Sequence, residues 1–93
     1  MNQVFWSPRA EDSYLAILEY TYFHSDTAAL NLDARIENLL RLLQKHKRMC
    51  PPAPSLPNVR RCVVTEHVSL AYEIVGSKVN IIAVVDNRMK PLL

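Results

Sequence analysis

Three apolar runs rich in β-branched residues dominate the last third of the chain and limit the folds that it can adopt. They span residues 61–65, 68–75 and 79–85 and are separated by Glu66-His67 and by Gly76-Ser77. This composition and this spacing of turn residues are typical of antiparallel strands. Gly76 is the only glycine of the chain, so it can supply the positive φ of a tight hairpin. The chain is therefore expected to be built on an antiparallel sheet.

Two stretches before this sheet have helical periodicity. Residues 2–6 alternate weakly and predict a short first strand, which ends at Ser7-Pro8, a pair typical of a helix start. One helix is expected from there to about residue 22, and its inner face consists of Ala10, Tyr14, Ile17, Leu18 and Thr21. A second is expected from a cap at Ser25 or Asp26 to about residue 48. Its apolar face consists of Ala29, Leu32, Ile36, Leu39, Leu40 and Leu43. The short connection predicts an antiparallel helical hairpin.

A proline-rich segment joins the helices to the sheet. Residues 51–57 contain four prolines, which exclude helix and sheet and predict a stiff, extended connection. A surface loop is favoured over a recognition segment for a proline-binding domain. The predicted order is β-α-α-β-β-β. The fold class is therefore α+β, with a helical hairpin packed on one face of an antiparallel sheet.

The composition indicates one folded domain. Of the 93 residues 49% are hydrophobic and 22% are charged, which argues against disorder. We expect no membrane span and no signal peptide. Cys50 and Cys62 lack CxxC spacing and flanking histidine ligands, so the sequence predicts a cytoplasmic chain with reduced thiols.

Charge is distributed unevenly along the chain. Residues 1–44 contain three arginines and six acidic residues, a net charge of −3. Residues 45–93 contain eight lysines and arginines and three acidic residues, a net charge of +5. A basic half favours nucleic acid or an acidic protein as partner, although a mixed, solvated surface produces the same division.

Strand alternation predicts which residues face the helices. If Cys62 and Val64 do so, the same face also carries Leu70, Tyr72, Ile74, Val79, Ile81, Ala83 and Val85. The opposite face then carries Arg61, Val63, Thr65, Ser69, Ala71, Glu73, Asn80, Ile82, Val84 and Asp86. Its apolar centre is larger than solvent alone requires and indicates a partner surface. A register displaced by one residue would exchange the two faces.

The sequence contains few candidates for chemistry. A single glycine excludes a glycine-rich phosphate loop, and His24, His46 and His67 are expected on a loop, a helix end and a turn. We therefore expect no metal site and no cofactor, and Cys62 as a small core residue. Arg60 and Arg61 open a strand expected to be central, and Arg88 ends the last one. The three could converge and bind phosphates or carboxylates, or could instead pair with Glu66, Glu73 or Asp86.

Several short motifs, in order along the chain, resemble the RelE/ParE superfamily of bacterial type II toxins. They are Trp6-Ser7-Pro8-Arg9-Ala10-Glu11, Asn58-Val59-Arg60-Arg61, Tyr72-Glu73-Ile74 and Val85-Asp86-Asn87-Arg88-Met89-Lys90-Pro91. The resemblance implies a single toxin domain over residues 1–93. It also implies a cognate antitoxin whose C-terminal segment wraps the sheet and the hairpin, and operator DNA bound only through that antitoxin.

The superfamily has two main activities. RelE-like members cleave mRNA on the ribosome with basic residues on the central strands and a C-terminal arginine that is accompanied by tyrosine or histidine. Arg61 matches one strand position and Arg88 lies next to the family's C-terminal arginine. Val63 and Ser69, however, replace a lysine and an arginine, and residues 89–93 contain no tyrosine or histidine.

ParE-like members instead inhibit DNA gyrase by binding, and they have a longer helical hairpin, as expected here for residues 8–48. The resemblance therefore favours a non-enzymatic gyrase inhibitor. The alternatives are a ribosome-dependent mRNA endoribonuclease that uses Arg61 and Arg88, and a toxin fold with only an interaction role. The residues expected to bind the target or the antitoxin are Arg60, Arg61, Val63, Ala71, Ile82, Val84 and Arg88.

Overall fold

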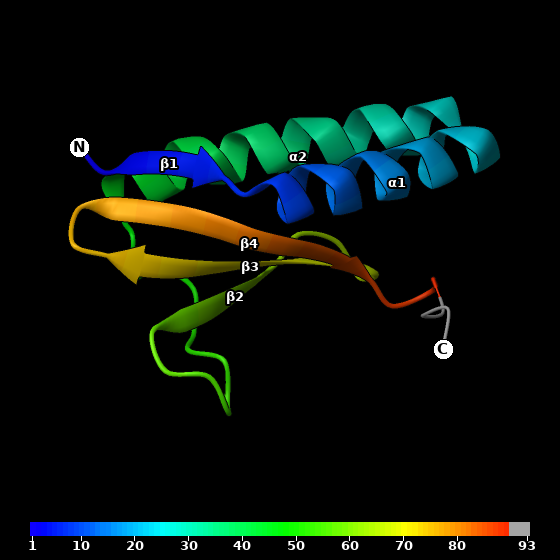
Figure 1. The fold of residues 1–93 in the computed structure, drawn as a ribbon. Coiled ribbons are helices and arrows are strands. Elements are labelled where there is room, and N and C mark those ends of the chain that lie inside the picture. The colour runs from blue at the N-terminus through cyan, green and yellow to red at the C-terminus, as the bar shows by residue number, and fades with distance from the viewer. Residues whose placement is uncertain (90–93) are drawn as a thin grey trace.

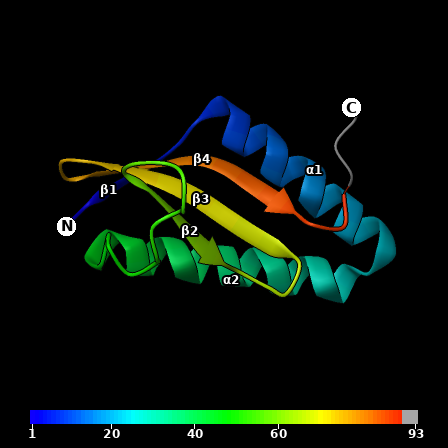
Figure 2. The ribbon, with the colours of Figure 1, turned by 90° about the horizontal axis from the view of Figure 1, so that it is seen from below.

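Two helices cover one face of a four-stranded sheet, and the other face points away from them (Figure 1). The computed structural model describes residues 1–89. Its elements are β1 (Gln3–Trp6), α1 (Pro8–His24), α2 (Asp26–Lys45), β2 (Val59–Val63), β3 (Val68–Val75) and β4 (Lys78–Asp86). The helices join at one end of the molecule and diverge toward the other, with the sheet across them (Figure 2). The predicted α+β fold and element order are confirmed. Lys90 and Pro91 of the last motif lie outside the described residues.

The strands lie in the order β1-β4-β3-β2. The pairings of β2 with β3 and of β3 with β4 are antiparallel, as predicted. The pairing of β1 with β4 is parallel, so the expectation of an entirely antiparallel sheet is wrong at this edge. A parallel pair needs a long crossover connection, which the chain between β1 and β4 provides. The expectation that Arg60 and Arg61 open a central strand is also wrong, because β2 is the other edge.

Serine residues define both helix starts. The Oγ of Ser7 accepts a hydrogen bond from the backbone N–H of Ala10 at 3.0 Å, and Pro8 occupies the first helical position. Ser25 ends α1 and also starts α2, because its N–H donates to the Thr21 carbonyl while its Oγ accepts from Ala28 N–H. A connection of one residue thus produces the predicted helical hairpin.

The second helix ends at Lys45 rather than near residue 48. Side chains of β2 and β3 donate hydrogen bonds to backbone carbonyl groups of the residues that follow α2. The Tyr72 hydroxyl donates to the Lys47 carbonyl at 2.6 Å, and Arg60 Nη1 donates to the carbonyls of Arg48 and Cys50 at 3.1 and 2.6 Å. These bonds fix residues 46–50 as a loop against the sheet.

A β-bulge in β4 changes which of its residues face the helices. Tyr72 pairs with Ile81 and Ala71 with Ala83, so Ile82 is an extra residue. Beyond it the alternation is displaced by one position. Val84 and Asp86 are buried, whereas Val85 is 52% exposed. The expectation that Ala83 and Val85 lie in the core is therefore wrong, as is the placement of Val84 and Asp86 on the open face.

The first helix covers the part of β4 that β1 does not reach. Ser7 N–H donates to the Ile81 carbonyl at 3.0 Å, which continues the contact of β1 with β4 into α1. Beyond the bulge, Val84 N–H donates to Ser13 Oγ at 3.1 Å. The hydroxyl thus satisfies a buried backbone donor for which β1 supplies no partner.

The proline-rich segment forms no helix and lies along the outer edge of β2. The expectation that its prolines exclude sheet pairing is wrong at one position, because Pro52 forms an isolated antiparallel bridge with Arg60. Ala53 N–H donates to the Val59 carbonyl at 2.8 Å, and Arg61 N–H donates to the Pro51 carbonyl at 3.0 Å. Asn58, with a φ of 64°, turns the chain back into the strand. The loop therefore covers part of an edge that would otherwise expose unpaired backbone groups.

A disulfide joins this loop to the strand, contrary to the expectation of reduced thiols. Cys50 and Cys62 are bonded, with their Cα atoms 5.2 Å apart, and both are buried. Cys62 is a core residue, as expected. The pairing could not be predicted from sequence spacing, because it depends on how the proline segment folds back onto β2.

Breaking this bond should lower stability without changing the fold. The cysteines are 12 residues apart. Closing a loop of this length lowers the entropy of the unfolded chain, so reduction should lower the free energy of unfolding by about 3 kcal/mol. Urea denaturation with and without dithiothreitol measures the change. A Cys50→Ala/Cys62→Ala variant should resemble the reduced protein and not respond to dithiothreitol. Identical midpoints for oxidised and reduced wild type would contradict the prediction.

Candidate target-binding groove

The open face of the sheet contains a groove of 470 Å³, called here the open-face groove. It lies between the start of α1, the proline-rich loop and the strands that face the viewer in Figure 2. Its lining residues are Arg9, Ala53, Leu56, Val59, Arg61, Ser69, Ala71, Ile82, Ala83 and Val85. Most of the lining is apolar, and both charged members are arginines.

The bulge and two small side chains create the hollow. Ile82 and Ala83 are consecutive, yet both line the groove because the bulge interrupts the alternation of β4. Ser69 and Ala71 on β3 leave space above the sheet. Leu56 of the proline-rich loop forms the opposite wall. A regular strand would place one of the two β4 residues in the core.

The two arginines of the groove have no acidic partner among residues 1–89. Arg61 Nη2 donates to Ser69 Oγ at 3.2 Å, which orients the guanidinium across β3. Arg9 lies in the first turn of α1, where the helix dipole disfavours a cation. An apolar hollow with two available guanidinium groups suits an amphipathic partner that supplies carboxylates.

The structure brings together three of the seven expected site residues, namely Arg61, Ala71 and Ile82. Val63 lies on the same face and is 77% exposed, but it does not line the groove. Arg60 points to the helix side, where it binds loop carbonyls. Val84 is 2% exposed and belongs to the core, so its expected place on a binding surface is wrong.

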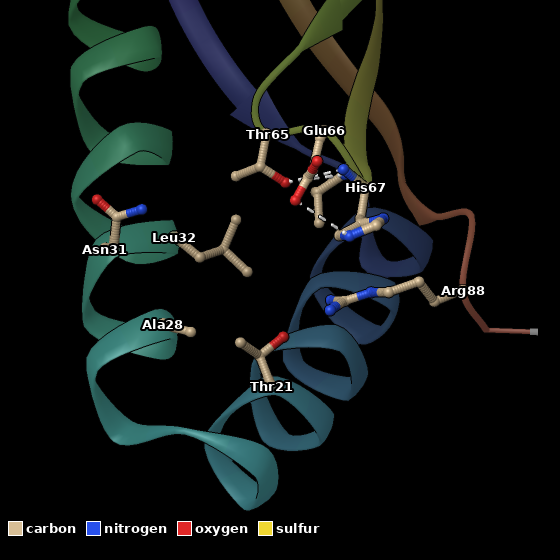
Figure 3. Close-up of a pocket in the computed structure, with 9 residues that line it drawn as sticks. Thr21, Ala28, Asn31, Leu32, Thr65, Glu66, His67 and Arg88 are labelled. Carbon is tan, nitrogen blue, oxygen red and sulfur yellow. Dashed lines mark hydrogen bonds and ion pairs between the residues drawn. The ribbon is translucent and has the colours of Figure 1, made fainter.

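Arg88 lies in a separate hollow of 240 Å³ between the helices and the β2–β3 turn (Figure 3). Its Nη2 and Nε atoms lie 2.7 and 3.1 Å from the carboxylate oxygens of Asp86, and its guanidinium lies over the ring of Tyr20. Asp86 is buried, and hydrogen bonding from Arg88 holds its pKa below the ordinary value. The alternative of an ion pair with Asp86 is thus confirmed for Arg88.

The expected convergence of the three arginines is wrong. Both β2 and β4 are antiparallel to β3, so they run in the same direction. Arg61, the middle residue of β2, pairs with Ala71 and lines the open-face groove, whereas Arg88 follows β4 at one end of the sheet and lines a different hollow. His67 lies beside Arg88 rather than Arg61, with its Nδ1 3.2 Å from Asn87 Oδ1. Residues 1–89 contain no cluster of histidine, cysteine and carboxylate side chains that could hold a metal ion.

Sequence reasoning missed six contributors to the groove. Arg9, Ala53 and Leu56 reach it from other elements, Val59 lines it from the start of β2, and Ala83 and Val85 reach it through the bulge. Two signals were available in the sequence. An arginine in a first helical turn opposes the dipole, and Leu56 is the one large apolar residue of the proline-rich segment.

Solved structures share this fold at low sequence identity. A chain of the chromosomal ParDE TA system from P. aeruginosa aligns with a TM-score of 0.74 and 19% identity, covering 92% of this chain and 96% of that one. The E. coli DinJ-YafQ complex gives 0.68 and 14%, with 95% and 96% covered. A YoeB/ParE toxin from Agrobacterium tumefaciens gives 0.67 and 14%, with 90% and 96% covered. At these identities the likeness shows the fold alone.

Sequence comparison is more specific. No curated protein matches the chain at a significant level. Within the described part of the chain, neither helix is long and apolar enough to cross a membrane. The model of the family described as ParE toxin of type II toxin-antitoxin system, parDE, matches residues 4–91, nearly the whole chain. The chain therefore belongs to the ParE family of toxins of type II toxin-antitoxin systems.

Proposed function

We propose that this toxin inhibits DNA gyrase by binding it through the open-face groove, without catalysing a reaction. One observation carries the proposal: Arg61 lines an apolar groove, whereas Arg88 is bound to Asp86 in another hollow. Cleavage of RNA requires a base, a cation and an acid around one phosphate. Arg61 is instead surrounded by Ala71, Ile82 and Val59, which suit a protein contact.

A cognate antitoxin is the second partner that we propose. Solved assemblies named for the pairs ParDE and DinJ-YafQ share the fold. An antitoxin segment with apolar and acidic side chains would fill the groove and neutralise Arg9 and Arg61. It would thereby exclude the target. We infer a cytoplasmic location, where gyrase is found, and there both redox states of the cysteine pair must support the fold.

Induced expression in a bacterial host tests the proposal. Gyrase inhibition predicts loss of supercoiling of a reporter plasmid, filamentation and a DNA-damage response, with transcripts intact. Co-expression of the cognate antitoxin should restore growth. Transcripts cut in their translated frames, with plasmid supercoiling unchanged, would replace the proposal with a ribonuclease. Normal growth on expression of the folded protein would leave only an interaction role.

A further inference from the structure

Basic side chains gather at the end of the molecule opposite the α1–α2 connection. Three segments meet there: the end of α2, the β3–β4 turn and the residues that lead into β1 (Figure 1). Lys47 Nζ donates to the Gly76 carbonyl at 2.7 Å, and Asn2 N–H donates to the Gln44 carbonyl at 2.8 Å. We call this surface the basic end, and its cationic side chains are Lys45, Lys47, Arg48, Arg60 and Lys78.

No ion pair within residues 1–89 neutralises these five side chains. Lys78 lies over the ring of Phe5, 5.9 Å from its centroid. Glu73 is the nearby carboxylate on the sheet, and its partner is Asn80 on the open face. The helix dipole accounts for Lys45 in the last turn of α2, but not for Arg48, Arg60 or Lys78, which lie on other elements.

The loop that carries Arg48 is held in place. Its carbonyl groups at Lys47, Arg48 and Cys50 accept hydrogen bonds from Tyr72 and Arg60, and the disulfide fixes Cys50. Arg48 and Arg60 line a hollow of 210 Å³ together with Pro52, Asn58, Val59 and Ile74. Arg60 Nη1 is already bound to two loop carbonyls. The Arg48 guanidinium, the remaining donors of Arg60 and the amide of Asn58 are the groups at this hollow that suit a phosphate, which guanidinium groups bind through hydrogen bonds.

We propose that the basic end binds the phosphate backbone of duplex DNA directly. Spread, solvated cations bind a polyanion through counterion release, whereas a protein interface has a desolvated, apolar centre. Single-stranded nucleic acid is usually bound by a series of exposed aromatic rings, whereas within residues 1–89 this end presents Phe5 alone, 46% exposed and with Lys78 over its ring. This contact is separate from the open-face groove and from operator binding through an antitoxin. It would place the toxin on the DNA independently of its protein target.

Fluorescence anisotropy with a labelled duplex of about 20 base pairs tests this, with the purified full chain and no gyrase. Four phosphate contacts predict an affinity that falls about 100-fold between about 50 and 200 mM salt. Lys45→Gln/Arg48→Gln removes two exposed cations and should weaken binding at least about tenfold at low salt, with a shallower salt dependence.

The matched control is Thr27→Glu/Ala34→Glu, which changes the net charge equally at exposed positions nearer the start of α2, away from the basic end. It should retain most of the affinity, and thermal denaturation should show that both variants fold. Equal weakening by the two variants would overturn the proposal. So would tighter binding of single-stranded RNA than of the duplex. Binding of polyglutamate without binding of the duplex would indicate an acidic protein partner instead.

Discussion

Replacing Arg88 with alanine is expected to lower the free energy of unfolding by about 2 to 4 kcal/mol. The Asp86 side chain is 0% exposed, so the change leaves a buried carboxylate without its cation. The Arg88 side chain is itself 39% exposed, so in the variant water can solvate part of the Asp86 carboxylate. The loss of stability is therefore smaller than for a fully buried ion pair. Urea denaturation at neutral pH measures the change. Arg41→Ala, at an exposed position of α2, is the control and should stay within about 0.5 kcal/mol.

The pH dependence gives this prediction a second readout. The hydrogen bonds from Arg88 lower the pKa of Asp86, so their contribution to stability is full above the unfolded pKa near 4 and is lost as the pH falls through the lower folded pKa. The destabilisation by Arg88→Ala should therefore shrink in acid. Asp86→Asn/Arg88→Ala should recover part of the loss. A variant as stable as wild type at neutral pH would contradict a structural role for Arg88.

Arg61→Glu is expected to weaken inhibition of gyrase supercoiling at least about 30-fold, because it reverses a charge within the proposed contact. In the wild-type toxin, Arg61 Nη2 donates a hydrogen bond to Ser69 Oγ, so the arginine side chain is oriented before it binds gyrase. The measurement is the toxin concentration that halves supercoiling by purified gyrase. Arg41→Glu has the same charge change on the helix side and should inhibit like wild type. Inhibition by Arg61→Glu at wild-type concentrations would remove Arg61 from the interface.

The elements could be predicted because their signals are local. Ser7-Pro8 and Gly76 lie at the expected boundaries, and the apolar face of α2 is the one that packs on the sheet. The order of the elements follows from the same local patterns, and the family motifs agree with it. The bulge could not be predicted in the same way. Ile82 and Val84 are both β-branched and apolar, so nothing in their sequence indicates where the alternation changes.

The candidate site depends on contacts between distant parts of the chain. Strand alternation correctly predicts that Arg60 and Arg61 point to opposite faces of the sheet. It does not predict that Arg60 binds the carbonyl groups of the loop after α2. The proximity of Arg9 to Arg61 follows from the parallel pairing of β1, which the sequence did not predict. The Cys50–Cys62 bond likewise requires the fold of the proline-rich loop. The sequence therefore predicted parts of the groove but not its assembly.

Supercoiling by purified gyrase, with ribosome-bound mRNA assayed in parallel, tests the central claim most directly. The proposed function predicts that the wild-type toxin stops supercoiling, that Arg61→Glu largely loses this effect, and that the mRNA stays intact. A toxin that cleaves the mRNA while gyrase continues to supercoil its substrate would contradict it.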